Sequence, residues 1–599
     1  MKDFCEHEAP AVFQTATVVE CVPTIGAEPI GSVYSLALVA DKKAVPAAGQ
    51  FFMLRSAKSQ QLLARPISVF SVTIVPNEDK IKIEFLILLK GQGTKELCAL
   101  KPGDQVELLG PCGNAFPRPE AGANICLAGA GVGIAPIAGF ASSLPDSSYD
   151  FFASFKSGSY GLKNVRAKNL TITTDDGSEG VHGMISAVLT ASYLREKKYS
   201  AVYACGPLAM LRYVQGICRE ANVQCYLSLE QKMACGMGVC LGCTIQTVDG
   251  YKRCCKDGPV FPGQKIIFEE PARTEKRERL KSVDLSVDIG GLRLKNPVIA
   301  SSGTFGFGTE YESVFNIGLL GGISSKGLTI EPRQGNTGVR VWETPSGLMN
   351  SIGLQNPGIP HFIKEELGQM KKLGCAVIAN LSGSTAESYC EGARLLEKSD
   401  VDAIELNISC PNVATGGAAM GMSCQSAGDI TKKIRALVTK PLIVKLTPQA
   451  PDIVGVAMAC KKAGADAISL CNSFQGVAID IERGCPVFDK IKAGFGGPAV
   501  RPIALRLVWE VVEAMNKLQK EERIPVIGIG GIATWRDAVE FIMAGAAAVQ
   551  VGTATFANPF AMKEIVEGLE AFMKRKGWKS VKDFCGIAQK KNNKSKERL

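Results

Sequence analysis

Histidine is scarce in this sequence, with three copies among 599 residues. His7, His182 and His361 lie far apart along the chain, so no two of them have the spacing of metal ligands on one helix or loop. This scarcity argues against a zinc site built from histidine. It argues equally against a Ser-His-Asp hydrolase, in which a histidine is the base.

Long uncharged apolar runs are also missing. The most membrane-like run, 125–141, is interrupted by Pro136 and by glycines, which suit a phosphate-binding loop better than a membrane span. We expect no secretory signal, since Met1 leads into acidic and polar residues. We therefore expect a cytoplasmic protein without a membrane partner, whose 21 cysteines are thiols, metal ligands or catalytic groups rather than disulfides.

Clustered positive charge is limited to one segment. The net charge is +10, and residues 590–598, with five Lys or Arg and one Glu, carry +4 of it. Such a run is typical of a solvated tail. Because no stripe of basic and aromatic residues accompanies it, we expect no nucleic-acid partner.

The composition changes most clearly at 269–283, a charge-dense stretch with a proline that is predicted to be a linker. The chain before it is first rich in β-strand patterns, then alternates strand and helix, and then becomes rich in cysteine. The predicted domains are a β-barrel at 11–118, an α/β domain at 119–225, a small cysteine-rich domain at 226–268, a β/α barrel at 284–575 and a basic tail at 576–599.

The second half contains eight short apolar runs that end in small or polar residues. Eight β/α units in about 300 residues are the arithmetic of a TIM barrel, whose active site lies at the carboxyl ends of the strands. Lys326, Asn380, Asn407, Lys445 and Asn472 lie at such ends. The runs are 297–303, 322–326, 376–380, 403–407, 442–445, 467–472, 526–530 and 547–552.

Glycine-rich turns follow the last two of these runs. Gly528-Ile-Gly-Gly531 and Gly552-Thr553 occupy the positions at which such barrels commonly bind a phosphate through backbone N–H groups. Gly496-Gly497 would close the same pocket. A phosphate site together with a lysine at a strand end favours FMN as the cofactor.

Cys410 is a candidate general base or nucleophile. It follows the fourth run in the segment Asn407-Ile-Ser-Cys-Pro-Asn412, where two amides flank it. No histidine lies nearby in the sequence to act instead. If Cys410 is a base, it takes its proton from a carbon that the substrate and an adjacent flavin activate.

Four cysteines have the spacing of iron–sulfur ligands. Cys235-x4-Cys240-x2-Cys243, followed by Cys255, matches plant-type 2Fe–2S ligation. Cys254 adjoins Cys255, so either residue can supply the fourth ligand. Zinc is the alternative metal, but the spacing favours the cluster.

The first half also carries nucleotide-binding patterns. Gly129-Ala-Gly131-Val-Gly133 follows a predicted strand at 124–128 and opens a helix, as in loops that hold a pyrophosphate or nicotinamide nucleotide. Arg65 could hold a flavin pyrophosphate through charge-assisted hydrogen bonds.

Nearly the whole chain resembles class 1B dihydroorotate dehydrogenase, with two parts fused that are commonly separate chains in that family. Residues 11–268 are similar to the electron-transfer subunit, a flavoprotein of the ferredoxin-reductase type. The matching segments there are Arg65-Pro-Ile-Ser68, Gly91-Gln-Gly-Thr94, Thr174-Asp-Asp-Gly177, Tyr203-Ala-Cys-Gly-Pro207, 230–243 and Cys255-Lys-Asp-Gly-Pro259.

Residues 284–570 are similar to the catalytic subunit. The matching segments are Ser302-Gly-Thr-Phe-Gly306, Asn350-Ser-Ile-Gly-Leu-Gln-Asn356, Glu405-Leu-Asn-Ile-Ser-Cys-Pro-Asn412, Lys445-Leu-Thr-Pro448 and 544–553. The resemblance implies oxidation of dihydroorotate to orotate in pyrimidine biosynthesis, with electrons passing from FMN through the 2Fe–2S cluster and FAD to NAD. It implies that Cys410 takes the C5 proton while C6 gives hydride to FMN.

The resemblance also implies the binding residues. The substrate would contact Lys326, Asn350, Ile352, Gly353, Leu354, Asn407, Asn412, Asn472 and Ser473. FMN would contact Ser302, Gly303, Lys326, Asn380, Asn407, Lys445, Gly497, Gly530, Gly531, Gly552 and Thr553. The first half would hold FAD and NAD through Arg65, Pro66, Ser68, Gly93, Thr94, Gly129, Gly131 and Gly133, and the cluster through Cys235, Cys240, Cys243 and Cys255.

Two other functions stay open at this point. One is an NADH-driven reductase of orotate or another pyrimidine, and the other is an electron-transfer module with a non-catalytic barrel. The sequence does not decide between NAD and NADP, because no clear acidic residue follows the glycine-rich turn and Lys156 lies in that neighbourhood. A homo-oligomer is expected.

Overall fold

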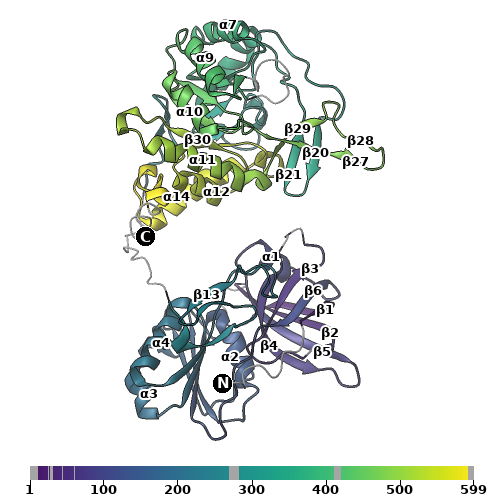
Figure 1. Ribbon diagram of the computed structural model, residues 1–599, viewed down its shortest axis with the longest axis vertical. Coiled ribbons are helices and arrows are strands. Elements are labelled where there is room, and N and C mark those ends of the chain that lie inside the picture. The colour runs from purple at the N-terminus through teal and green to yellow at the C-terminus, as the bar shows by residue number, and fades with distance from the viewer. Residues whose placement is uncertain are drawn as a thin grey trace. The chain divides into compact units, whose positions relative to one another are not determined.

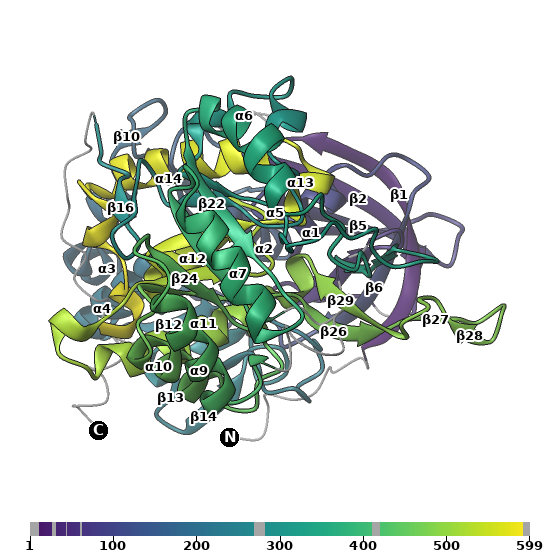
Figure 2. The same cartoon turned by 90° about the horizontal axis from the view of Figure 1, so that it is seen from above.

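The computed structural model describes residues 11–24, 26, 32–43, 45–59, 61, 63–268, 282–409 and 420–590. The chain forms two compact units, Met1–Arg273 and Thr274–Leu599, whose helices and strands are drawn in Figures 1 and 2. The division between the units falls inside 269–283, the expected linker.

A closed antiparallel barrel begins the first unit, so the predicted β-barrel is confirmed. Its strands neighbour one another in the order β1-β2-β5-β4-β3-β6. Ile81, Ile83 and Phe85 alternate along β5 and are completely buried, which is the two-residue period of a strand with one apolar face. The elements are β1 Val12–Pro23, β2 Val33–Asp41, β3 Phe51–Ser56, β4 Arg65–Ile74, β5 Lys80–Leu88, α1 Gln92–Cys98 and β6 Gln105–Cys112.

A seven-stranded sheet follows in the order β10-β9-β8-β7-β11-β12-β15. Strands β7 and β8 are buried at every position, as expected at the centre of a parallel sheet that is covered on both faces. The strand predicted at 124–128 continues to Ala130 before the chain turns into a helix. The elements are β7 Ile125–Ala130, α2 Ile134–Ala141, β8 Tyr149–Phe155, β9 Asn169–Thr174, β10 Val181–His182, α3 Ala191–Lys197, β11 Ala201–Cys205, α4 Leu208–Ala221, β12 Gln224–Ser228 and β15 Val260–Pro262.

The cysteine-rich region is continuous with this sheet. The expected boundary at 225/226 falls inside β12, and β15 returns from beyond the cysteines to pair antiparallel with β12. Leu227 and Phe261, which face each other in this pair, are both buried, so the returning strand completes the core. The cysteine loop itself is followed by a hairpin of β13, Thr244–Thr247, and β14, Gly250–Arg253.

Eight parallel strands close the barrel of the second unit in the order β18-β19-β22-β23-β24-β25-β30-β31. All eight predicted runs are strands of this barrel, so the predicted TIM barrel is confirmed. Helices α7 and α9 to α12 pack outside the strands together with α14 (Figures 1 and 2). The strands are β18 Val298–Ala300, β19 Gly322–Ser324, β22 Ala376–Leu381, β23 Ala403–Asn407, β24 Leu442–Lys445, β25 Ala467–Leu470, β30 Val526–Ile529 and β31 Ala548–Val551. The helices are α5 Ile359–His361, α6 Leu367–Lys372, α7 Ala386–Glu397, α9 Cys424–Arg435, α10 Ile453–Lys462, α11 Arg501–Asn516, α12 Trp535–Ala544, α13 Ala554–Ala557 and α14 Ala561–Lys576.

A four-stranded sheet, in the order β20-β21-β29-β26, is an addition to the eight β/α units. Its strands are short and rich in small residues, so the sequence patterns give no signal for them. A small hairpin, β27–β28, projects from the same region in Figure 2. The strands are β20 Val341–Thr344, β21 Gly347–Asn350, β26 Phe474–Val477, β27 Ile479–Asp480, β28 Cys485–Pro486 and β29 Lys492–Gly496.

The two ends of the barrel unit lie together. The Asp284 N–H donates to the Lys579 carbonyl over 2.8 Å, and Asp284 forms a bridge with Ser580. The following hairpin, β16 Val287–Asp288 and β17 Arg293–Leu294, packs where β25 begins, since a Cβ on Gly290 would lie 2.3 Å from the Asp466 carbonyl oxygen.

The expected tail at 576–599 differs from the structure over its first half. Trp578 and Phe584 stack with ring centroids 4.8 Å apart and are buried in the core of the barrel unit. Residues 577–590 are therefore part of the barrel unit, because two aromatic side chains outweigh the charged residues around them.

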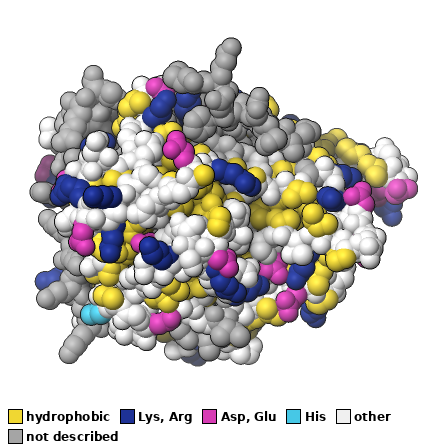
Figure 3. All heavy atoms as spheres, turned by 90° about the horizontal axis from the view of Figure 1, so that it is seen from below, with side chains coloured by type: hydrophobic (Ala, Val, Ile, Leu, Met, Phe, Trp, Pro, Cys, Tyr) yellow, Lys and Arg dark blue, Asp and Glu magenta, His cyan; other side chains and the backbone are white. Residues whose placement is uncertain are grey.

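Among the described residues, no helix combines the length and apolar character needed to cross a bilayer. On the face drawn in Figure 3, Lys and Arg side chains are interspersed with acidic and apolar ones.

Candidate active site

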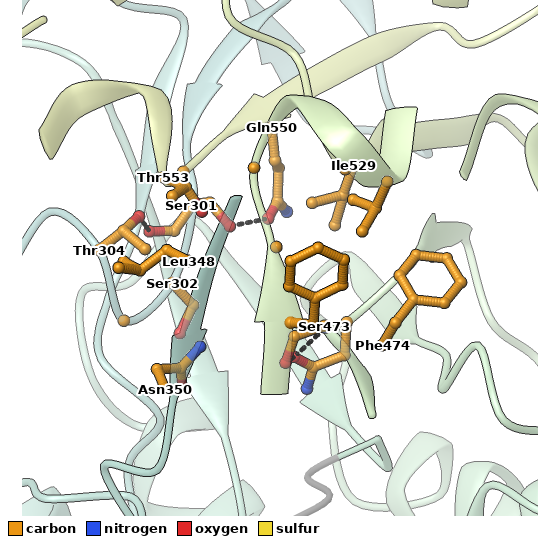
Figure 4. A pocket seen from close by; sticks show the side chains of 18 of the residues that line it. Ser301, Ser302, Thr304, Leu348, Asn350, Ser473, Phe474, Ile529, Gln550 and Thr553 are labelled. Carbon is orange, nitrogen blue, oxygen red and sulfur yellow. Dashed lines mark hydrogen bonds between the residues drawn. The ribbon is translucent and has the colours of Figure 1, made fainter. Parts of the chain in front are cut away.

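A pocket opens at the carboxyl ends of the barrel strands, where barrels of this type place their active sites. In Figure 4, Ser302 and Asn350 lie on one side of it, and Ser473 and Phe474 on the other, with Gln550 between them. The residues that were predicted from the sequence and line this pocket are Ser302, Gly303, Lys326, Asn350, Ile352, Gly353, Leu354, Asn407, Lys445, Asn472, Ser473, Gly497, Gly530, Gly531, Gly552 and Thr553.

Three predicted residues of the barrel are not in this lining. Asn380 is completely buried and hydrogen-bonds Asn407, which does line the pocket. Cys410 and Asn412 lie outside the described residues, so their roles stay predictions.

The charge of the pocket is one-sided. Lys326 and Lys445 line it, and none of the described lining residues is acidic. The nearest counter-charge is Glu405 on β23, whose carboxylate lies 4.0 Å from the Lys445 Nζ and is completely buried. Burial alone would raise the pKa of the Glu405 carboxyl, but the Lys445 charge and hydrogen bonds from Gln550 and other donors outweigh it and lower that pKa. The pocket therefore suits an anionic ligand.

The glycine turns after β30 and before α11 form a cradle for a phosphate. Gly497, Gly530 and Gly531 have φ values of +99°, +126° and +73°, which turn backbone N–H groups in directions that other residues rarely allow. Gly552 and Thr553, which follow β31, line the same pocket. Backbone N–H groups exposed by such glycine turns bind phosphate, so the cradle fits a phosphate group.

Gly531 is the residue of this cradle that tolerates substitution least. A Cβ there would lie 2.7 Å from the backbone nitrogen of Arg501, where α11 begins. We expect Gly531→Ala to lower the free energy of unfolding by about 1–3 kcal/mol, because strain at a positive φ adds to the clash, and to lose bound FMN. Thermal unfolding and flavin content measure the two effects.

Gly368→Ala is the matched control. Gly368 lies in α6, is exposed, and has no atom within 4 Å of the added Cβ. Alanine suits a helix better than glycine, so this variant should keep both stability and FMN. Equal flavin content in the two variants would contradict the phosphate cradle.

Sequence reasoning missed several residues of the site. Phe474 and Phe495 reach the pocket from the additional sheet, whose strands were not predicted. Gln550 on β31 also lines the pocket. Glu405 lies within an apolar run, and a charged residue inside a buried strand was the signal that could have found it.

In the first unit, the structure brings two predicted flavin motifs together. A Cβ on Gly93 would lie 2.4 Å from the Arg65 Nε, so the guanidinium covers the start of α1. The Thr94 hydroxyl accepts hydrogen bonds from the N–H groups of Lys90 and Gly91. Pro66 and Ser68 pair with β3 beside them. This is an arginine beside a glycine turn, a combination that suits a pyrophosphate.

The glycine turn at 129–133 meets a second turn at the end of the neighbouring strand. A Cβ on Gly133 would lie 2.7 Å from the Gly206 nitrogen, and a Cβ on Gly131 would meet nothing within 4 Å. Strands β7 and β11 are parallel neighbours, so their carboxyl ends form one edge. Nucleotides bind at this edge of such sheets.

The four predicted cluster cysteines form two interacting pairs. Cys235 interacts with Cys240, and Cys243 with Cys255. Burial raises the pKa of the Cys235 thiol, but backbone N–H groups, including those of Cys240 and Met237, outweigh it and bring that pKa to about 6. In a 2Fe–2S cluster each iron takes two thiolates, so pairs fit this donor set.

A site for a single metal ion is not preformed by these thiols, since the described residues contain no group of three or more ligands close enough to hold one ion. Both Cys254 and Cys255 interact electrostatically with Cys243, and Cys255 interacts with Cys235 as well. This supports Cys255 as the fourth ligand. The cysteine loop packs on the first barrel, because a Cβ on Gly236 would lie 2.6 Å from Met53.

A closed β/α barrel with a phosphate cradle and a cationic pocket at its strand ends is the framework of an enzyme that uses a phosphorylated cofactor. The sequence pattern of the family described as "Dihydroorotate dehydrogenase" matches residues 284–573. That of the "Iron-sulfur cluster binding domain of dihydroorotate dehydrogenase B" matches residues 230–267.

Curated relatives match the same family. The dihydroorotate dehydrogenase B (NAD(+)) catalytic subunit of Petrotoga mobilis is 50% identical over 305 residues, which are 51% of this chain and 99% of that protein. The subunit of the same name from Bacteroides thetaiotaomicron is 46% identical over 307 residues, again 51% of this chain and 99% of that protein. This chain belongs to the dihydroorotate dehydrogenase family, and it carries an iron–sulfur part ahead of the catalytic barrel.

Proposed function

We propose that this chain is a fused, NAD-linked dihydroorotate dehydrogenase that oxidises dihydroorotate to orotate in pyrimidine biosynthesis. The observation that carries the proposal is the pocket at the strand ends, which combines Lys326 and Lys445 with several amides and has no acidic residue in its described lining. Orotate offers a carboxylate and amide edges, for which lysine and asparagine are suitable partners. A non-catalytic barrel would have no use for such a lining.

FMN, when bound, would accept hydride from C6 of the substrate. Gly530, Gly531, Gly552 and Thr553 would hold its phosphate, since they all line the pocket. Lys445 and Asn407 would hold the flavin ring, with Ser302, Gly303 and Gly497 beside it.

The chain's own groups bind the substrate and move its C5 proton. Cys410 accepts that proton as the general base. Lys326 holds the substrate carboxylate, and Asn350, Asn472 and Ser473 hold the amide edges, because these four residues line the same pocket. The segment Ile352-Gly-Leu354 covers the substrate.

The first unit would carry the electrons to NAD. Arg65, Pro66, Ser68, Gly93 and Thr94 would hold FAD on the first barrel. Gly129, Gly131 and Gly133 would hold NAD at the edge of the parallel sheet. Cys235, Cys240, Cys243 and Cys255 would hold the cluster that links FMN to FAD in the electron path. A homo-oligomer, a cytoplasmic location and the lack of a nucleic-acid partner stay predictions from the sequence.

Anaerobic titration of the whole chain tests the proposal. Dihydroorotate should bleach the flavin absorbance and reduce the cluster, and NAD should then restore both, because the electrons have an outlet. Dihydrouracil, which lacks the carboxylate that Lys326 would bind, should leave the spectrum unchanged. Equal bleaching by both compounds would contradict orotate-type specificity, and a chain reduced by NADH but not by dihydroorotate would favour the reductase alternative.

A further inference from the structure

Glu405 is a charged residue in the middle of the barrel. It lies on β23 and is completely buried, and it does not line the pocket itself but contacts Gln550 and Lys445, which do. Its two oxygens accept hydrogen bonds from Ser324 Oγ at 2.9 Å, Asn380 Nδ2 at 2.6 Å, Ser469 Oγ at 2.9 Å and Gln550 Nε2 at 2.7 Å.

A buried carboxylate of this kind has no packing role. An apolar residue of similar size would fill the space without the cost of removing a charge from water. The Lys445 Nζ, at 4.0 Å, supplies the opposite charge and lines the pocket. Glu405 therefore supplies a counter-charge to a lysine that lines the pocket.

The carboxylate also sets the direction of a chain of hydrogen bonds. An ionised carboxylate only accepts, so the Asn380 amide must turn its NH₂ group toward Glu405 and its oxygen away. That oxygen accepts from Asn407 Nδ2 at 3.0 Å. The Asn407 oxygen is thereby left to accept from the Ser409 hydroxyl at 2.8 Å.

The chain continues around the pocket. Asn472 Nδ2 donates to the Ser409 hydroxyl oxygen at 2.9 Å, and the Asn472 oxygen accepts from the Ser473 N–H at 2.8 Å. Asn407, Asn472 and Ser473 all line the pocket. Each amide in this series can hydrogen-bond both of its partners in only one orientation. The series begins at Glu405, whose carboxylate can only accept.

A second, shorter arm runs from the other carboxylate oxygen. Gln550 donates its NH₂ group to Glu405, and its own oxygen accepts from the Ser301 hydroxyl at 3.3 Å, a contact drawn in Figure 4. Gln550 lines the pocket as well. Because the Glu405 carboxylate can only accept hydrogen bonds, it determines the orientation of the side-chain amides in both arms, including those that line the pocket.

We propose that Glu405 is a positioning residue: it fixes which edges of the pocket amides face the substrate, and it holds the Lys445 ammonium in place at the pocket. The proposal rests on the proposed function for the identity of the ligands. Glu405 touches neither ligand and acts through Asn380, Gln550 and Lys445.

Glu405→Gln in the full chain tests this role. A carboxamide has one oxygen, which can serve Asn380 or Gln550, and its NH₂ group must face the donor of the other arm. That arm has to reverse or lose its partner, and the charge opposite Lys445 is gone. We expect orotate affinity to fall at least about tenfold, measured from the orotate-induced change in FMN absorbance. FMN affinity on reconstitution of the apoprotein and the flavin midpoint potential should also change.

The pair Asn380→Asp/Glu405→Gln should restore orotate binding to within about threefold of wild type. The new carboxylate at position 380 accepts from the amide at 405 and still accepts from Asn407, so the chain keeps its direction. The buried cluster also keeps one negative charge for Lys445. If Glu405→Gln does not fold, the test rests on the double variant, which must then fold and bind orotate.

Thr431→Val is the matched control for losing a buried hydrogen bond. Thr431 lies on α9, is completely buried and donates to the Ala427 carbonyl at 2.7 Å, away from the pocket. It should lose thermal stability but keep orotate and FMN affinities. Normal binding in Glu405→Gln, or a double variant no better than the single one, would overturn the proposal. A wild type that shows no response to orotate would instead refute the proposed function, and FMN reconstitution would still test Glu405.

Discussion

Replacing Cys410 with alanine is expected to slow dihydroorotate-driven flavin reduction by about 10²- to 10⁴-fold, the usual contribution of a general base. FMN and orotate should stay bound, because the groups that hold them belong to other residues. Removing a proton from a carbon beside a carbonyl requires a positioned acceptor, and the described pocket lining offers no histidine or carboxylate for it. Stopped-flow bleaching of FMN measures the rate.

Cys410→Ser tests whether the acidity of the thiol is required, because serine places a weaker acid of similar size at the same position. A hydroxyl gives up its proton less readily than a thiol, so this variant should be slow at neutral pH and recover in part as the pH rises. Lys326 and Lys445 line the pocket, and a cation close to Cys410 would favour its thiolate. Cys424→Ala, at an exposed cysteine at the start of α9, is the matched control and should bleach at the wild-type rate. Rapid bleaching in Cys410→Ala would move the base role to another residue.

Cys240→Ser is expected to abolish turnover with NAD or NADH while dihydroorotate oxidation by an artificial acceptor continues. Cys240 belongs to one of the two thiol pairs, and a serine cannot replace the thiolate that an iron requires. Iron content should fall with the loss of NAD-linked turnover, since the electrons then have no path between the flavins. Iron analysis and the two steady-state assays give the result.

The neighbouring cysteines provide the control for this experiment. Cys255→Ser should lose iron as Cys240→Ser does, whereas Cys254→Ser should retain it. Burial raises the pKa of the Cys254 thiol to about 12, and it lies beside the pairs rather than in either of them. Retained iron in Cys240→Ser, or lost iron in Cys254→Ser with Cys255→Ser intact, would show that the ligands are assigned wrongly.

The sequence sufficed for the barrel and for most of the pocket because both depend on local patterns. Each barrel strand is a short apolar run, and Lys326, Asn407, Lys445 and Asn472, which end such runs, all line the pocket, whereas Asn380 is buried outside the lining. Gly530 and Gly531 have positive φ values, which glycine adopts more readily than other residues, so their presence in the sequence favoured a turn at this place.

What the sequence could not predict depends on contacts between distant segments. In the sequence, Glu405 is only a charged residue within an apolar run. Its role depends on strands β22, β25 and β31, which bring their polar side chains around it. The sheet that contains Phe495 exists only because β21, β29 and β26 meet. Residues 577–590 read as a charged tail, and only the folded barrel provides the surface that buries Trp578.

The pairing of Asp284 with Ser580 has a consequence for how such chains can evolve. The two ends of the barrel unit lie together at this pairing. The hairpin that follows Asp284 packs against Asp466, the residue just before β25. The ends therefore lie by the amino-terminal ends of the strands, and the pocket lies at the carboxyl-terminal ends. A segment fused at either end is therefore covalently attached near the amino-terminal strand ends, whatever position its domain then takes. A fusion in either order can leave the residues of the pocket unchanged.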